Sequence, residues 1–208
     1  MLGITLLGIF AVLVVLGKTP TGDTWPVRLL ASEPTGPRVG LIAGHWQSDA
    51  GTVCADGLQE ADVNLAVAKA VAARLRAEGF RAEVLAEFDD ALDGYQAAAL
   101  VSIHADSCQS SLSGFKVARS ANSAIPETED RLVALLYEHY QAETGLLPHT
   151  NTITDDMRDY HAFRQIAPET PAAIIECGFL GGDRAMLTEH QDRVARGIAT
   201  AVVSFLAP

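Results

Sequence analysis

Three short segments of the chain carry side chains that could bind one metal ion together. They supply His45, Glu60 and His104. Two imidazoles and one carboxylate hold a Zn²⁺ ion with its fourth position open to water, which distinguishes catalytic zinc sites from closed structural ones. The residue types therefore predict a catalytic centre with one zinc ion bound by His45, Glu60 and His104.

A fourth segment places an acid in apolar surroundings. Glu176 follows residues 172–175, Ala-Ala-Ile-Ile, a run typical of a buried strand. An unpaired buried charge is costly, so this carboxylate needs a partner or a task. A helix cap or a buried ion pair would satisfy it. Beside a metal it could instead take a proton from the bound water and pass it to a leaving amine. We expect Glu176 to be the catalytic base and acid of metal-assisted amide hydrolysis.

Alternating strands and helices are the elements that must bring these residues together. Strand patterns cover residues 39–43, 81–86, 99–103, 114–119 and 172–176, and helical patterns cover 58–78, 127–143 and the end of the chain. This order predicts one α/β domain with a largely parallel, twisted sheet flanked by helices on both faces. His45, His104 and Glu176 then fall at the carboxyl ends of strands, where open α/β sheets bind ligands. Glu60 falls in the first turn of the helix after the first strand.

The beginning of the chain differs from the rest. Residues 1–17 contain no charged side chain. The run is slightly shorter than the roughly 20 apolar residues that span a bilayer, and it lacks the basic start of a signal peptide. An uncleaved membrane anchor is our preferred interpretation, with a cleaved signal as the alternative. Residues 18–37 are expected to be a flexible linker and 38–208 the catalytic domain, located outside the cytoplasm in the cell envelope, either membrane-anchored or secreted.

Composition and charge limit the partners. A chain of 208 residues with 49% apolar side chains suits one globular domain with a sizeable core. The net charge of −11 leaves no basic stripe for phosphate contacts, which excludes nucleic acid as a partner. We expect a monomer.

Four blocks of sequence surround the candidate residues. In chain order they are Gly44-His45 with Asp49 and Gly51, Gly57-Leu58-Gln59-Glu60 leading into Asn64-Leu65, Val101-Ser102-Ile103-His104-Ala105, and the run from Pro171 to Leu180. Together they resemble the zinc-dependent N-acetylmuramoyl-L-alanine amidases of the amidase-3 family, over most of residues 38–208. The resemblance implies zinc binding by His45, Glu60 and His104 and catalysis by Glu176. It also implies that the substrate is bacterial peptidoglycan, cut between N-acetylmuramic acid and L-alanine.

Some segments depart from the family pattern. Residues 46–48, Trp-Gln-Ser, stand where family members commonly carry two glycines, and residues 87–98 lack the Thr-Arg and Arg-x-x-x-Ala-Asn elements expected there. These differences affect substrate fit more than metal binding. Trp46 could stack on a sugar or peptide face, or simply pack. Arg164 could bind a stem-peptide carboxylate, or form a surface ion pair.

The three cysteines leave at least one thiol unpaired within the chain. Cys54 lies between two candidate ligands and Cys108 follows the third, so we expect a disulfide between Cys54 and Cys108. Cys177 should stay free. It follows Glu176 on a strand and should point to the opposite face, which argues against a nucleophilic role.

Two other functions stay open. A non-catalytic peptidoglycan-binding or amidase-regulating module could keep the fold, although it would have little need for the ligands and Glu176 together. A zinc peptidase acting on the stem peptide would use similar chemistry, and product analysis separates it from an amidase. A structural zinc site would require four protein ligands, most of them cysteines, with no open position. The sequence lacks cysteines at the spacing of such a site.

Overall fold

The computed structural model describes residues 15–18, 24–27 and 34–207 of the chain, which divides into two units, Met1–Glu33 and Pro34–Pro208. In the first unit, strands β1 (Val15–Lys18) and β2 (Thr24–Val27) pair antiparallel, so part of the expected linker forms a strand. The expected membrane segment, residues 1–17, lies outside the described residues except for 15–17. Within the described ranges, none of the helices combines the length and apolar character that a bilayer span requires.

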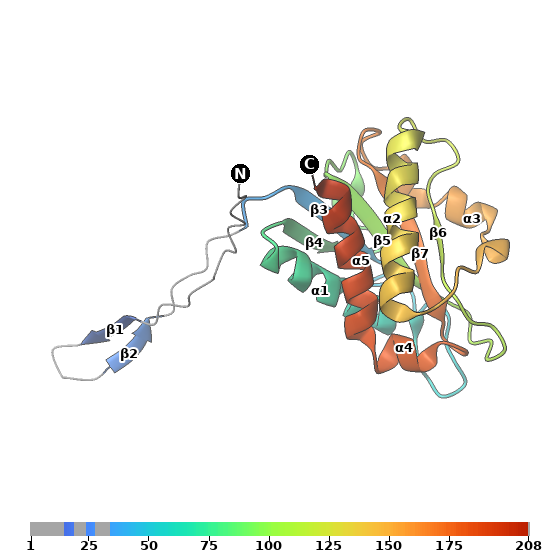
Figure 1. The fold of residues 1–208 in the computed structure, drawn as a ribbon, viewed down its shortest axis with the longest axis horizontal. Helices are drawn as coiled ribbons and strands as arrows, with labels where there is room; N and C mark the ends of the chain where they lie inside the picture. The colour runs from blue at the N-terminus through green and yellow to red at the C-terminus, as the bar shows by residue number, and fades with distance from the viewer. Residues whose placement is uncertain (1–14, 19–23, 28–33, 208) are drawn as a thin grey trace, which may run out of the picture. The chain divides into compact units, whose positions relative to one another are not determined.

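A mostly parallel sheet organises the second unit (Figure 1). Within the described residues it has five strands, in the order β4-β3-β5-β7-β6. Their bounds are Arg38–Ala43 for β3, Arg81–Leu85 for β4, Ala99–Asp106 for β5, Lys116–Ala118 for β6 and Ala172–Phe179 for β7. Only the edge strand β6 is antiparallel to its neighbour among the strands of this sheet. The prediction of an α/β domain with a largely parallel sheet is confirmed.

The long helices all cover one face of the sheet. They are α1 (Glu60–Ala77), α2 (Pro126–Thr144) and α5 (Gln191–Leu206), and α5 packs against both of the others (Figure 1). The short helix α4 (Arg184–Thr188) leads into α5. The other face is covered by α3 (Asp155–Arg158) and the 3-10 turns η1 (Asp90–Leu92) and η3 (His161–Arg164). A further turn, η2 (Thr150–Thr152), precedes α3. Both faces are therefore covered, but the second one only by short segments.

Strand alternation decides which face each site residue joins. In β5, Val101 and Ile103 pack into the core under the long helices, whereas Leu100 packs into the smaller core on the opposite face. Successive side chains of a strand point to opposite faces. His104 therefore points to the thinly covered face, where its ring meets the ring of Tyr160 edge to face at 5.6 Å. Cys177 belongs to the core under the long helices, so its neighbour Glu176 shares the face of His104.

The order of the strands creates a site at one edge of the sheet. From β3 the chain passes through α1 to β4 on one side, and later enters β5 on the other side of β3. Ligands of open α/β sheets bind outside the carboxyl ends of strands where the order reverses in this way. The carboxyl ends of β3 and β5 lie at that point, and β7 is the next strand beyond β5.

A disulfide joins Cys54, in the loop before α1, to Cys108, just after β5, with a sequence separation of 54. A cross-link that closes a loop of this size destabilises the unfolded chain by about 4 kcal/mol in the chain-entropy model.

We expect the double variant Cys54→Ser, Cys108→Ser to lose about 2–5 kcal/mol of unfolding free energy, measured by chemical denaturation.

Reduction of the unaltered protein should produce the same loss of stability. Cys177 is free and buried in the described chain, so Cys177→Ala serves as the control. The stability of Cys177→Ala should still fall when reductant is added, whereas the stability of the double variant should not change. A double variant as stable as the oxidised, unaltered protein would contradict this prediction.

Candidate metal centre

His45 follows β3 directly after Gly44 and adopts a backbone φ of 65°, which is uncommon for a residue other than glycine. Its Nδ1 lies 2.7 Å from Oδ1 of Asp49, and the same oxygen accepts the backbone N–H of Gly51 at 2.7 Å. The other ring nitrogen, Nε2, faces Glu60. A carboxylate that engages one nitrogen of an imidazole in this way leaves the second nitrogen available to a metal.

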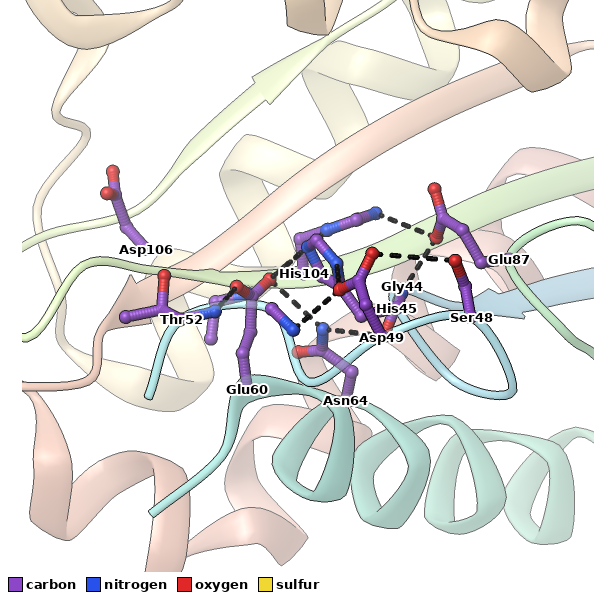
Figure 2. Close-up of polar contacts among 12 residues, drawn as sticks. Gly44, His45, Ser48, Asp49, Thr52, Glu60, Asn64, Glu87, His104 and Asp106 are labelled. Atoms are coloured by element: carbon purple, nitrogen blue, oxygen red, sulfur yellow. Dashed lines mark hydrogen bonds and ion pairs between the residues drawn. The ribbon is translucent and has the colours of Figure 1, made fainter. Parts of the chain in front are cut away.

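Glu60 is the first residue of α1 and is only 4% exposed. Its Oε1 lies 3.2 Å from Nδ1 of His104 and 3.3 Å from Nε2 of His45, and its Oε2 accepts the N–H of Thr52 at 3.0 Å (Figure 2). Burial by itself would raise the pKa of Glu60, but hydrogen bonds with both imidazoles and with Thr52 outweigh it and hold the pKa below its usual value. Glu60 is therefore ionised at neutral pH.

His104 packs flat against Gly44, which explains the glycine beside His45. A Cβ atom built at position 44 would lie 2.4 Å from Cε1 of His104, closer than real atoms approach. Asn64, one turn along α1 from Glu60, donates to the carbonyl of Gly44 at 3.1 Å and to Oε1 of Glu60 at 3.2 Å. These contacts tie together the end of β3, the end of β5 and the start of α1.

The arrangement of His45, Glu60 and His104 fits a divalent cation. One ligand atom from each residue lies within 4.8 Å of the other two. Tetrahedral zinc, with bonds of about 2.0–2.1 Å, keeps its ligand atoms about 3.3 Å apart. The distances of 3.2 and 3.3 Å from Oε1 of Glu60 to the two imidazoles agree with that spacing.

The charges around these residues favour the same cation. The hydrogen bond with Glu60 raises the pKa of His45 to about 9. Burial alone would lower the pKa of His104, but Glu60, Glu176 and Glu87 together raise it. The carboxylates therefore stabilise positive charge between His45 and His104. A cation bound by the two neutral imidazoles would provide that positive charge.

Glu176 stands beside this cluster, on the residue of β7 that pairs in register with His104 of β5. Its Oε2 is shielded from solvent and has no hydrogen-bond partner among the described residues. The pKa of Glu176 is raised to about 7, first by burial and also by the negative charges of Glu60 and Asp106, against the opposing influence of His104 and Lys116. A carboxyl group that titrates near neutrality can both accept and donate a proton.

Lys116 forms its ion pair with Asp106 rather than with Glu176, although it is the residue opposite Glu176 on β6. Its buried ammonium group donates to Oδ2 of Asp106 at 2.6 Å, and to the carbonyl and hydroxyl oxygens of Thr152 at 2.9 and 3.2 Å. These three acceptors use the three N–H groups of the lysine. The carboxylate of Glu176 is therefore not in an ion pair with this lysine, and it lies beside the candidate metal-binding residues.

The structure brings the four central residues together, and the other candidates make contacts of their own. Trp46 is half-buried and packs against the core under the long helices. Arg164 lies at the surface in an ion pair with Asp159, with 2.5 Å between Nη1 and Oδ1. Burial raises the pKa of the Cys177 thiol, which keeps it protonated and unreactive.

Sequence reasoning missed Glu87 as a site residue. It is 6% exposed and follows β4, whose carboxyl end lies beside that of β3. Its Oε2 accepts the backbone N–H of His45 at 2.8 Å, while its Oε1 accepts from the hydroxyl of Tyr160 at 3.0 Å and lies 2.9 Å from Nε2 of His161. The strand-end rule that singled out His45 would also have found Glu87.

Comparison with known proteins adds to this geometry. A family model described as N-acetylmuramoyl-L-alanine amidase, Amidase_3, matches residues 39–204. The catalytic domain of CwlV, an N-acetylmuramoyl-L-alanine amidase from Bacillus (Paenibacillus) polymyxa var. colistinus, is 25% identical, with a TM-score of 0.64 over 81% of this chain and 97% of that one. No curated protein matches the chain.

Two further structures share the fold. An N-acetylmuramoyl-L-alanine amidase from Clostridium difficile 630 is 22% identical, with a TM-score of 0.64 over 82% of this chain and 97% of that one. The CwlD amidase from Clostridioides difficile, in complex with the GerS lipoprotein, is 19% identical, with a TM-score of 0.63 over 82% of this chain and 98% of that one. At these identities the likeness supports the fold alone.

Proposed function

The chain belongs to the Amidase_3 family of N-acetylmuramoyl-L-alanine amidases, and from this premise we propose that it is a zinc-dependent hydrolase of bacterial peptidoglycan. It cleaves the amide bond between the lactyl group of N-acetylmuramic acid and L-alanine, which frees the amino terminus of the alanine and leaves the glycan intact. The observation that carries this proposal is the convergence of His45, Glu60 and His104 beside Glu176, whose Oε2 is shielded from solvent.

Three residues would hold the zinc ion, and their surroundings prepare them for it. A zinc ion held there would supply Lewis-acid chemistry, because zinc polarises carbonyl groups and lowers the pKa of water to about 7. Asp49 engages Nδ1 of His45 and so directs Nε2 to the ion. Glu60 contributes a negative charge, because hydrogen bonds keep its carboxylate ionised at neutral pH. His104 completes the set from the end of β5.

Glu176 moves the proton that amide hydrolysis requires. Its carboxylate takes a proton from the attacking water as the new C–O bond forms, and then delivers that proton to the alanine nitrogen as the C–N bond breaks. Without this delivery the nitrogen would have to leave as an amide anion, which is a very poor leaving group. A pKa of about 7, raised mainly by burial, suits both transfers.

The setting is outside the cytoplasm, where peptidoglycan lies. The disulfide between Cys54 and Cys108 suits an oxidising compartment. We propose that residues 1–17 anchor the chain to the membrane or direct its export, and that the enzyme acts as a monomer on peptidoglycan without nucleic acid.

Digestion of purified peptidoglycan by the full chain, followed by mass analysis of the fragments, tests this function. We expect stem peptides with a free L-alanine amino terminus and intact glycan strands. A zinc chelator should reduce the rate to background, because His45, Glu60 and His104 would lose the ion that they hold. Addition of one equivalent of Zn²⁺ after removal of the chelator should restore the rate.

The alternative functions produce different results in the same assay. Cuts within the stem peptide would identify a zinc peptidase. Binding to peptidoglycan without any cleavage by the zinc-loaded chain would identify a non-catalytic or regulatory module. Activity that survives complete removal of zinc would contradict the metal-dependent mechanism.

A further inference from the structure

Glu87 is a buried carboxylate beside the metal-binding residues that the proposed reaction does not use. Its two oxygens face different groups. Oε2 faces the candidate ligands, with the backbone nitrogen of His45 at 2.8 Å and Nε2 of His104 at 3.6 Å (Figure 2). Oε1 faces away from them, toward the hydroxyl of Tyr160 and the ring of His161.

The proton of His104 has to be on the correct nitrogen for metal binding. Nδ1 of His104 faces Glu60, so this is the nitrogen that must be bare when it binds a cation. A neutral imidazole carries its one proton on the other nitrogen, here Nε2. Nε2 is buried and has no hydrogen-bond partner within 3.5 Å in the described chain, and Oε2 of Glu87 is a carboxylate oxygen 3.6 Å from it. Glu87 therefore favours the tautomer that can bind metal.

The other imidazole has an equivalent arrangement. Asp49 lies 2.7 Å from Nδ1 of His45, which directs Nε2 toward Glu60. Carboxylates that engage the far nitrogen of a metal-binding imidazole fix its tautomer and orientation, and their loss typically weakens metal affinity about 10- to 100-fold. Each candidate histidine ligand thus has a carboxylate on the side away from Glu60.

Glu87 also has contacts that hold it in place. The hydroxyl of Tyr160 accepts from Oγ of Ser102 at 3.0 Å, so its own proton goes to Oε1 of Glu87. The ring of His161 stacks on Phe88 with 4.3 Å between centroids. The carboxylate is held on one side by these groups and on the other by the N–H of His45, whose φ of 65° needs a compensating contact. It therefore has little freedom to turn away from His104.

We propose that Glu87 is a positioning residue for the zinc site. It keeps the proton of His104 on Nε2 and holds the backbone of His45 in its uncommon conformation, so that both imidazoles present a bare nitrogen to the ion. This inference rests on the proposed zinc-dependent function.

The variant Glu87→Gln tests this role, because an amide has an acceptor on only one side. If its oxygen stays with Tyr160 and His161, its NH₂ group confronts the N–H groups of His45 and His104. We expect zinc affinity to fall about 10- to 100-fold, measured by competition with a chromophoric chelator. The visible spectrum of the Co²⁺-substituted variant should also change, because the two imidazoles are displaced.

Glu83→Gln is the matched control, since it makes the same substitution on β4 itself. Glu83 bonds to Arg38 and Tyr95, and neither contacts the candidate ligands. Its zinc affinity and Co²⁺ spectrum should equal those of the unaltered protein. Thermal unfolding of both variants without metal measures any loss of folding separately.

Nitrogen-15 NMR of the unaltered, zinc-loaded protein gives a second measurement that does not depend on the folding of a variant. The proton of His104 should be on Nε2, and a proton on Nδ1 would overturn the inference. Equal zinc affinity and an unchanged Co²⁺ spectrum in Glu87→Gln would also overturn it. If the unaltered protein binds no zinc, the proposed function itself fails, which is a distinguishable result.

Discussion

Glu176→Gln should lower the rate of peptidoglycan hydrolysis by about 10²- to 10⁴-fold while zinc binding and folding remain intact. Glutamine has nearly the same shape but cannot take a proton from water or deliver one to the leaving nitrogen. Because Oε2 of Glu176 has no hydrogen-bond partner within the described chain, the substitution breaks no bond at that atom. The loss should therefore appear in kcat, with zinc content unchanged.

Glu129→Gln provides a matched control for this experiment. Glu129 is also buried, at 5% exposure, and its Oε2 likewise lacks a hydrogen-bond partner among the described residues. It bonds to the N–H of Ala172, at the amino end of the same strand β7 whose carboxyl half carries Glu176. Its turnover should stay close to that of the unaltered protein. Full activity in Glu176→Gln would exclude Glu176 as the group that transfers the proton.

His45→Ala should weaken zinc binding more than loss of a carboxylate that only orients a ligand, because it removes a proposed ligand itself. Loss of such an orienting carboxylate typically weakens metal affinity about 10- to 100-fold. Hydrolysis should fall to background. Zinc content after dialysis and the dissociation constant from chelator competition measure the effect. Asp49→Asn, which keeps the imidazole but alters the group that orients it, should show an intermediate loss.

Backbone strain at position 45 has to be separated from the loss of the ligand. Alanine at a φ of 65° is strained, whereas glycine adopts that value freely. His45→Gly should therefore fold at least as stably as His45→Ala and lose zinc to the same extent. If either variant retained full zinc occupancy, His45 could not be a ligand.

The central residues were predictable because one topological rule applies to most of them. His45, His104 and Glu176 each lie at or just past the end of a strand pattern, and the ends of parallel strands meet at one edge. In the structure β5 continues to Asp106 and β7 to Phe179, yet His104 and Glu176 still pair in register. The bounds of the elements were less accurate. The first long helix begins at Glu60 rather than at residue 58, because Val53 and Gln59 form a bridge that keeps the preceding residues in a turn.

Contacts between distant segments were beyond the reach of the sequence pattern. Glu87 meets Tyr160 and His161 across 73 and 74 residues, and nothing local in the sequence marks that pairing. The short segments that cover one face of the sheet were not predictable either. A helix as short as Asp155–Arg158 is too short to show a helical period in its sequence. Trp46 and Arg164 were left with two interpretations each because each depended on a single residue without a converging partner.

The position of β7 between β5 and β6 has a consequence for biosynthesis. The ribosome makes β6 before β7, yet in the sheet β6 pairs with β7 and not with β5. A nascent chain that has reached β6 already contains His45, Glu60 and His104 but still lacks the strand that carries Glu176. Under the proposed function, hydrolysis therefore requires a late segment, β7, to take its place between β5 and β6.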